Sequence, residues 1–203
     1  MYANVFELTK CLADCIEYCE EYPDRRHSDF YLPLLEQAQD ELRKTTDRAN
    51  REFVEWRMES RDDELAWKHL SRKLSNIQDQ LASVNAIGYI DQNVSYRNRE
   101  ALEEAVDEMM DYLRERTDDL DFADDEADKL ERQLTKAKSE GEESERALDE
   151  YLRFSKMRAN GLTTTKDTIA NFRKALRRDL GRRDETYQSI RWPQQIAPDE
   201  RVM

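Results

Sequence analysis

Apolar residues recur at every seventh position along two long stretches of the chain. This heptad repeat is sustained well beyond the three or four heptads that indicate a coiled coil. Strands and disordered acidic segments do not keep such a phase, so we expect an all-α antiparallel helical hairpin. The first row is Leu35, Leu42, Ala49, Trp56, Asp63, Leu70, Ile77 and Val84, and the later rows run from Leu102 to Tyr151 and from Val106 to Ser155.

The composition excludes several other classes of protein. Only 4 of the 203 residues are Gly and 4 are Pro, too few for the many turns of a sheet protein. No apolar run approaches the roughly 20 residues that would cross a bilayer. With 33 basic and 46 acidic residues the formal charge is −13, which disfavours nucleic acid as a partner. No secretory signal pattern opens the sequence, so we expect a cytoplasmic location.

Breaker residues divide the heptads into four predicted helices within one helical domain, residues 1–192. The expected stops are Pro23, Gly88 and Gly161, and Pro33 is expected in the first turn of the second helix. The tail after Trp192 holds two prolines and should be extended. The predicted helices are 2–22, 31–87, 97–160 and 165–191, and the predicted tail is 193–203.

The short loop between the second and third helices makes them antiparallel neighbours. Paired residue numbers should then sum to 184–186. The two short helices would complete a four-helix bundle at the open end of the hairpin, and the rest would be a two-helix stalk. The fourth helix would fold back over residues 133–158.

Four residues on core-phase positions are poor core residues: Asp63, Arg116, Gly141 and Ser144. One interpretation is a buried polar device that fixes the register of the hairpin. The other is a hinge near Gly141, because glycine weakens a helix interior.

Three cysteines are the only thiols, and they follow one another at four-residue spacing on the first helix: Cys11, Cys15 and Cys19. Free cysteine usually packs as a small apolar residue. Two other interpretations are a thiophilic metal site, with His27 of a charged loop as a further ligand, and a redox or intersubunit role. No Gly-rich phosphate loop, nucleophile elbow or paired metal-ligand motif is present. We expect no enzyme, no cofactor and no metal.

Charge is distributed unevenly along the chain. The third predicted helix is acidic, whereas the fourth is basic and amphipathic. Three interpretations stay open: solvated faces, self-assembly through contact of the two regions, and a membrane or nucleic-acid surface. Trp192, followed by Pro193, is a further candidate as part of a docking peptide. The candidate interaction residues are Arg173, Lys174, Arg177, Arg178, Arg182, Arg183, Asp118, Asp119, Asp121, Asp124, Asp125 and Trp192.

The sequence favours a non-enzymatic structural or scaffolding protein. Its expected partners are further copies of itself, as an oligomer or filament, or another protein. The order of a short amphipathic helix, a proline, a long helical hairpin and a further short helix resembles the phage-shock-protein A and ESCRT-III type of membrane-remodelling polymer. That resemblance implies side-by-side packing of hairpins and insertion of the first helix into a membrane surface, which is the alternative function.

Overall fold

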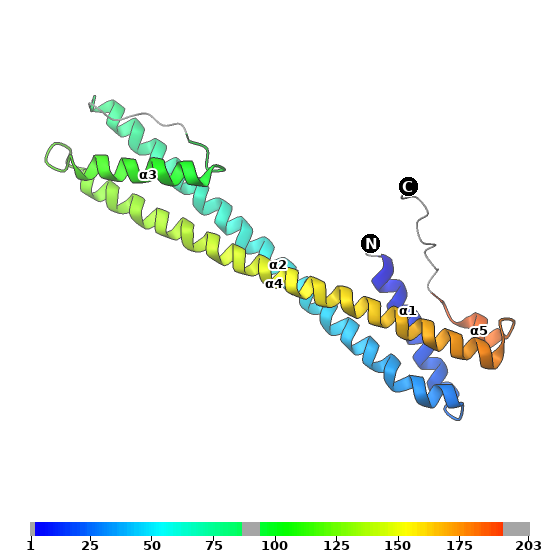
Figure 1. Ribbon diagram of the computed structural model, residues 1–203. Helices are drawn as coiled ribbons and strands as arrows, with labels where there is room; N and C mark the ends of the chain where they lie inside the picture. Colours follow the sequence, from blue (N-terminus) through cyan, green and yellow to red (C-terminus); the bar gives the residue numbers. More distant parts are fainter. Residues whose placement is uncertain (1–2, 87–93, 193–203) are drawn as a thin grey trace, which may run out of the picture. The chain divides into compact units, whose positions relative to one another are not determined.

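The computed structural model describes residues 3–86 and 94–192 (Figure 1). Every regular element in these two ranges is a helix, so the all-α prediction is confirmed. The residues form two compact units: unit 1 is residues 1–51 with 152–203, and unit 2 is residues 52–151. The helices are α1 (Ala3–Glu21), α2 (Arg26–Ser83), α3 (Arg99–Arg114), α4 (Ala123–Leu180) and α5 (Glu185–Ser189).

The predicted antiparallel hairpin is confirmed, and its two long helices are α2 and α4. In unit 2, the hydroxyls of Ser60 and Ser144 lie 3.2 Å apart. In unit 1, a Cβ atom on Gly161 would lie 3.4 Å from Thr45 Oγ1. The predicted register was wrong, because it would place Ser60 opposite residues 124–126. The chain between the two helices spans residues 84–122 rather than a short loop, and this shifts the pairing by about 20 residues.

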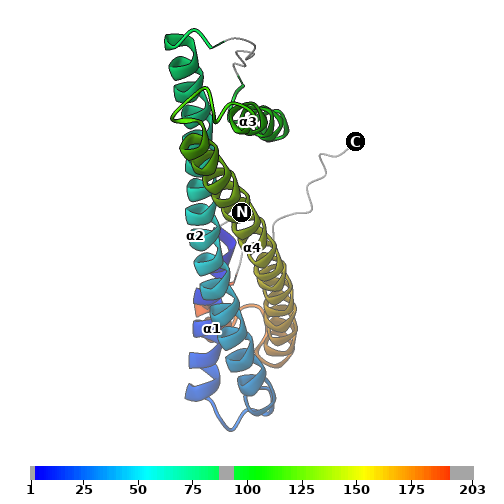
Figure 2. The same cartoon turned by 90° about the vertical axis from the view of Figure 1, so that its left-hand side faces the viewer.

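Unit 2 holds three helices rather than the predicted two-helix stalk. Figures 1 and 2 show α3 beside the second half of α2 and the first half of α4. The core is a single cluster in which Leu70 and Ile77 of α2, Leu102 and Val106 of α3, and Leu130 of α4 are fully buried. The third helix supplies the apolar cover that a bare pair of helices would lack.

The predicted helix 97–160 is wrong because turns at residues 115–122 separate α3 from α4. This segment contains Thr117, Asp118 and Asp119, whose short polar side chains compete with helical hydrogen bonds. The next turn begins α4 with Asp124, Asp125 and Glu126, where carboxylates interact favourably with a helix N-terminus. The heptad phase continues through the break, so apolar spacing alone does not detect it.

Unit 1 combines four helical segments, α1, the first half of α2, the second half of α4 and α5, with α5 in the place of the predicted fourth helix 165–191. Its core is a cluster that includes Leu12 of α1, Leu35 of α2 and Phe172 of α4. The predicted start of the second helix at residue 31 is wrong, because α2 begins at Arg26. Pro33 therefore lies inside the helix and not in its first turn, so it removes one backbone hydrogen bond from an otherwise regular helix.

The predicted stop at Gly161 is also wrong, as α4 continues to Leu180 and does not fold back. Gly161 instead lets α4 approach Thr45 of α2 closely. Residues 163–165 are helical, and Thr163 Oγ1 donates to the carbonyl of Ala159. The helix ends where Gly181 adopts a φ of +89°, a left-handed conformation that suits glycine. The predicted helix 165–191 is thus the end of α4, a turn and α5.

Gly141 inside α4 and Gly181 just after its end should respond in opposite ways to alanine. Gly141→Ala should stabilise the protein by about 0.5–1 kcal/mol, since Gly is a weaker helix former than Ala. A Cβ there would lie 3.5 Å from Asp63 Oδ1, an ordinary contact. Gly181→Ala should destabilise it by about 1 kcal/mol because its φ is positive. Chemical denaturation followed by circular dichroism measures both, and destabilisation by Gly141→Ala would contradict the prediction.

The predicted polar core positions have separate roles. Asp63 is buried, and Arg99 Nη2 donates to its Oδ2 at 2.6 Å. Ser144 pairs with Ser60, and Arg116 lies in the turns with its guanidinium 4.6 Å from the ring centre of Tyr112. The helix is unbroken at Gly141, so the structure gives no sign of a hinge there. The predicted ends at Tyr2, Ile87 and Gly88 and the tail 193–203 lie outside the described residues.

Candidate functional site

The predicted basic residues lie at the end of α4 and in the turn that follows it. Ile169, Phe172 and Leu176 bury one face of this part of α4, so the basic side chains between them point outward. Within the described part of the chain, neither Lys174 nor Arg177 forms an ion pair. The basic segment, as used below, is Lys174, Arg177, Arg178, Arg182 and Arg183, all exposed.

Arg173 differs from these residues because it is half-buried and holds the chain's last described turn in place. Its Nε donates to the hydroxyl of Tyr187 at 3.1 Å, and its guanidinium lies 5.3 Å from the ring centre of Trp192. We therefore assign Arg173 to the packing of unit 1 rather than to a free surface.

Trp192 is partly buried and packs against the unit 1 core. Its indole Nε1 donates to the carbonyl of Tyr187 at 3.0 Å. The neighbouring Arg191 forms a fork on Asp14 of α1, with Nη2 2.6 Å from Oδ1 and Nε 2.9 Å from Oδ2. This hydrogen-bonded contact lowers the pKa of Asp14. Trp192 thus lies in a segment fastened to α1, while the rest of the predicted docking peptide lies outside the described residues.

The predicted acidic residues surround the turns between α3 and α4. Asp125 interacts with Lys129 one helical turn later, and this hydrogen bond lowers the pKa of Asp125. No ion pair to the other four occurs within residues 3–86 and 94–192. The acidic segment, as used below, is Asp118, Asp119, Asp121, Asp124 and Asp125, all exposed. It belongs to unit 2, whereas the basic segment belongs to unit 1.

The three cysteines are fully buried in the unit 1 core. Cys11 Sγ and Cys15 Sγ lie 3.9 Å apart, and their contact together with burial raises the pKa of Cys15. Burial raises the pKa of Cys19 to about 11. Thiols of this kind are poor nucleophiles and poor metal ligands at neutral pH, so the arrangement favours the packing interpretation.

His27 lies in the first turn of α2 and not in a loop, which corrects its predicted place as a nearby metal ligand. It is buried, and its Nδ1 donates to Asp179 Oδ2 at 2.8 Å. The hydroxyl of Tyr18 lies 2.9 Å from its other ring nitrogen. The contact with His27 lowers the pKa of Asp179. These three side chains tie α1, α2 and α4 together, a role that sequence spacing does not reveal.

Two surface features were not predicted from the sequence: a cluster of glutamates and a groove. Among the described residues, one group of three potential metal ligands has carboxylate oxygens that all lie within 4.8 Å of one another. It consists of Glu59, Glu140 and Glu143. Burial and the neighbouring carboxylates raise the pKa of Glu59. Such an acidic cluster by itself defines no site, since it lacks a bound ion or a further buried ligand.

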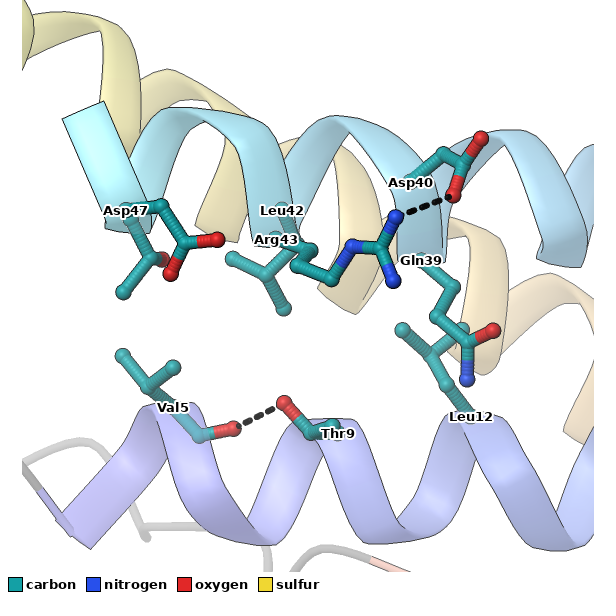
Figure 3. A pocket seen from close by; sticks show the side chains of 9 residues that line it. Val5, Thr9, Leu12, Gln39, Asp40, Leu42, Arg43 and Asp47 are labelled. Atoms are coloured by element: carbon teal, nitrogen blue, oxygen red, sulfur yellow. Dashed lines mark hydrogen bonds and ion pairs between the residues drawn. The ribbon is translucent and has the colours of Figure 1, made fainter.

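A groove of about 380 Å³ lies between α1 and α2 in unit 1 (Figure 3). Its apolar walls come from Val5 and Leu12 of α1 and from Leu42 of α2. Arg43 and Asp40 form an ion pair of 4.0 Å on one side. The lining of the groove contains no cysteine and no histidine.

None of the described helices contains a stretch both long and apolar enough to cross a membrane. Comparisons with protein-family models, with curated proteins and with solved structures gave no match to this chain. Its function is therefore inferred from its own surfaces.

Proposed function

We propose that this chain is a non-enzymatic structural protein that associates with further copies of itself. The basic segment of one copy binds the acidic segment of the next copy. The observation that carries the proposal is that eight of these ten side chains, all but Asp125 and Arg178, face solvent without an ion pair to the described chain.

The charge of the two units supports this pairing. Unit 2 holds 14 basic and 29 acidic residues, a net charge of −15, whereas unit 1 holds 19 and 17, a net charge of +2. The whole excess of acid therefore lies in unit 2. The basic segment of one copy is therefore attracted to unit 2 of another copy.

Such a contact joins two different surfaces, so each added copy leaves one basic and one acidic segment free. Heterologous contacts of this kind produce rings when they close and filaments when they do not. The contact should weaken as salt rises, because exposed charges are screened over about 10 Å at 0.1 M salt.

Reversing the basic segment tests the proposal. We expect the wild type to assemble at about 50 mM salt and to dissociate near 500 mM, since the contact is ionic. The variant Arg177→Glu, Arg178→Glu, Arg182→Glu, Arg183→Glu should sediment as the 24.2 kDa monomer at both salts. Arg173 stays unchanged because it packs within unit 1.

A matched control reverses four other basic side chains of unit 1, at Arg25, Arg26, Arg153 and Lys156, all exposed. This control carries the same net charge and should still assemble. A wild type that is monomeric at low salt would overturn the proposal. Assembly of the basic-segment variant would overturn the assigned contact.

Ion pairs alone do not account for stable association. Exposed pairs contribute at most about 1 kcal/mol each, whereas a micromolar dissociation constant requires about 8 kcal/mol. Four such pairs supply about half of that at best. A self-associating chain of this kind therefore needs a second contact surface.

The membrane alternative draws little support from α1. Leu8 and Leu12, which would insert into lipid, are buried in unit 1, and among the large apolar side chains described on α1 Phe6 is the one that is exposed. Tyr2 lies outside the described residues. Insertion of α1 would first have to remove it from the unit 1 core.

A further inference from the structure

The outward face of α2 in unit 2 carries a row of basic side chains. Arg57, Arg61, Lys68 and Arg72 follow one another at intervals of four, seven and four residues. At 3.6 residues per turn this spacing forms a straight row about 22 Å long on the side opposite Leu70. The three arginines are exposed, Lys68 is half-buried, and no ion pair to any of them occurs among the described residues.

The outward face of α3, extended by the C-cap residue Glu115, carries an acidic row with the same intervals. Glu100, Glu104, Asp111 and Glu115 are again four, seven and four residues apart, on the side opposite Leu102. All four carboxylates are exposed, and within the described ranges none forms an ion pair. The two rows therefore match in length and spacing and are opposite in charge.

Both rows place like charges one helical turn apart, as in Arg57 with Arg61 and Glu100 with Glu104. Like charges at this spacing destabilise a helix. Glu64 lies one turn from Arg61, and Arg114 lies one turn from Asp111, but within the described residues neither forms an ion pair with a member of the two rows. A partner with the complementary row would relieve this repulsion on both helices at once.

The basic row of α2 borders exposed apolar side chains. Val54, Met58 and Leu65 are 57%, 61% and 39% exposed, and they lie next to the arginines on the same side of the helix. An apolar strip with a charged rim is typical of a protein contact surface. Glu64 lies between Arg61 and Lys68 along the helix, and it accepts a hydrogen bond from the hydroxyl of Tyr96.

We propose that the α2 row binds the α3 row of a second copy of this chain, with the apolar strip packed on the methylene groups of the partner's acidic side chains. This inference rests on the proposed self-association and supplies the second contact that it requires. The intervals of four, seven and four residues are the same in both directions along each row. Four charged pairs therefore form whether the two helices are parallel or antiparallel. The contact is heterologous, so it adds copies in an open series.

Charge swapping tests this contact in the full-length protein. One variant reverses the basic row to glutamate, and the other reverses the acidic row to lysine. Each alone should lose self-association at low salt and sediment as a monomer. A 1:1 mixture should associate again, because every row then meets an opposite one. A chain with both reversals keeps the wild-type net charge and should also self-associate. The substitutions are R57E, R61E, K68E and R72E, and E100K, E104K, D111K and E115K.

A control reverses three exposed basic residues elsewhere in unit 2, at Arg132, Lys136 and Arg146 of α4, and should associate normally. Circular dichroism should show unchanged helix content in every variant. Association of both single-row variants at wild-type strength would overturn the inference while leaving the proposed function intact. A wild type that never associates would overturn both.

A lipid occupant gives a different result. Vesicles of phosphatidylserine and phosphatidylcholine serve as the probe in a sedimentation assay. The second-copy contact predicts that any vesicle binding is the same in the wild type and the basic-row variant. Binding that is lost in that variant, with self-association unchanged, would overturn the inference and assign the α2 row to anionic lipid.

Discussion

Replacing Phe172 with alanine should cost about 3–5 kcal/mol of unfolding free energy, the usual range for a large aromatic side chain removed from a core. Phe172 is fully buried on α4 at the centre of unit 1. Its ring packs edge-on against those of Tyr18 and Tyr31, with centres 6.0 and 5.5 Å away. Its loss leaves a cavity between α1, α2 and α4 that none of the three helices can fill alone.

Chemical denaturation followed by circular dichroism measures the effect of Phe172→Ala. Phe6→Ala is the matched control, because Phe6 lies in the same unit and is 65% exposed. The control should change the free energy of unfolding by less than about 1 kcal/mol. A cost for Phe172→Ala no larger than that of the control would contradict the packing described for unit 1.

The second large effect is expected at the buried carboxylate of unit 2. The side chain of Asp63 is 8% exposed, and its Oδ1 has no hydrogen-bond partner in the described structure. Arg99→Ala would remove the 2.6 Å contact to Oδ2 and leave the carboxylate buried and unpaired. We expect a loss of about 2–4 kcal/mol, since breaking one partner of a buried pair is strongly destabilising.

Removing both charges should reverse most of that loss. The double variant Asp63→Leu, Arg99→Ala places an apolar residue on a heptad position and should recover to within about 1 kcal/mol of the wild type. Arg97→Ala serves as the control because Arg97 is exposed and its guanidinium lies 5.8 Å from the ring centre of Tyr96. Equal denaturation curves for Arg99→Ala and Arg97→Ala would rule out this account of Asp63.

The heptad rows predict burial well. Leu35, Leu42, Leu70 and Ile77 of the first row are all core residues, whereas Val84 at its end is half exposed. Helical spacing selects the buried face directly, because only residues about 3.5 positions apart return to one side of a helix. For this reason the helical class and the antiparallel hairpin could be predicted from the sequence alone.

The same spacing conceals the turns at residues 115–122. Leu113, Leu120 and Ala127 keep a strict interval of seven although they lie in α3, the turns and α4. The better signal was the run of threonine and aspartates that ends at an acidic first turn. When that break is not recognised, α3 is not predicted as a separate helix, and the predicted register is wrong.

The sequence identified the candidate interaction residues by their charge but did not show which of them pack inside the protein. Sequence analysis selected the basic and acidic segments, but Arg173 and Trp192 prove to be packed in unit 1. The matching rows of α2 and α3 escaped it, because the outward faces of both helices are defined only once α3 exists as a separate helix.

The sequence by itself determined that the chain is helical, which residues face inward, and where opposite charges concentrate. These properties follow from local spacing and composition. Tertiary structure decided the number of helices in unit 2, the register of α2 against α4, and the structural role of each glycine. Gly161 is a close contact and Gly181 is a helix end, although both are glycines after an apparent helical stretch. The role of Gly161 depends on Thr45 of a neighbouring helix, which no local pattern contains, whereas that of Gly181 depends on its left-handed backbone conformation.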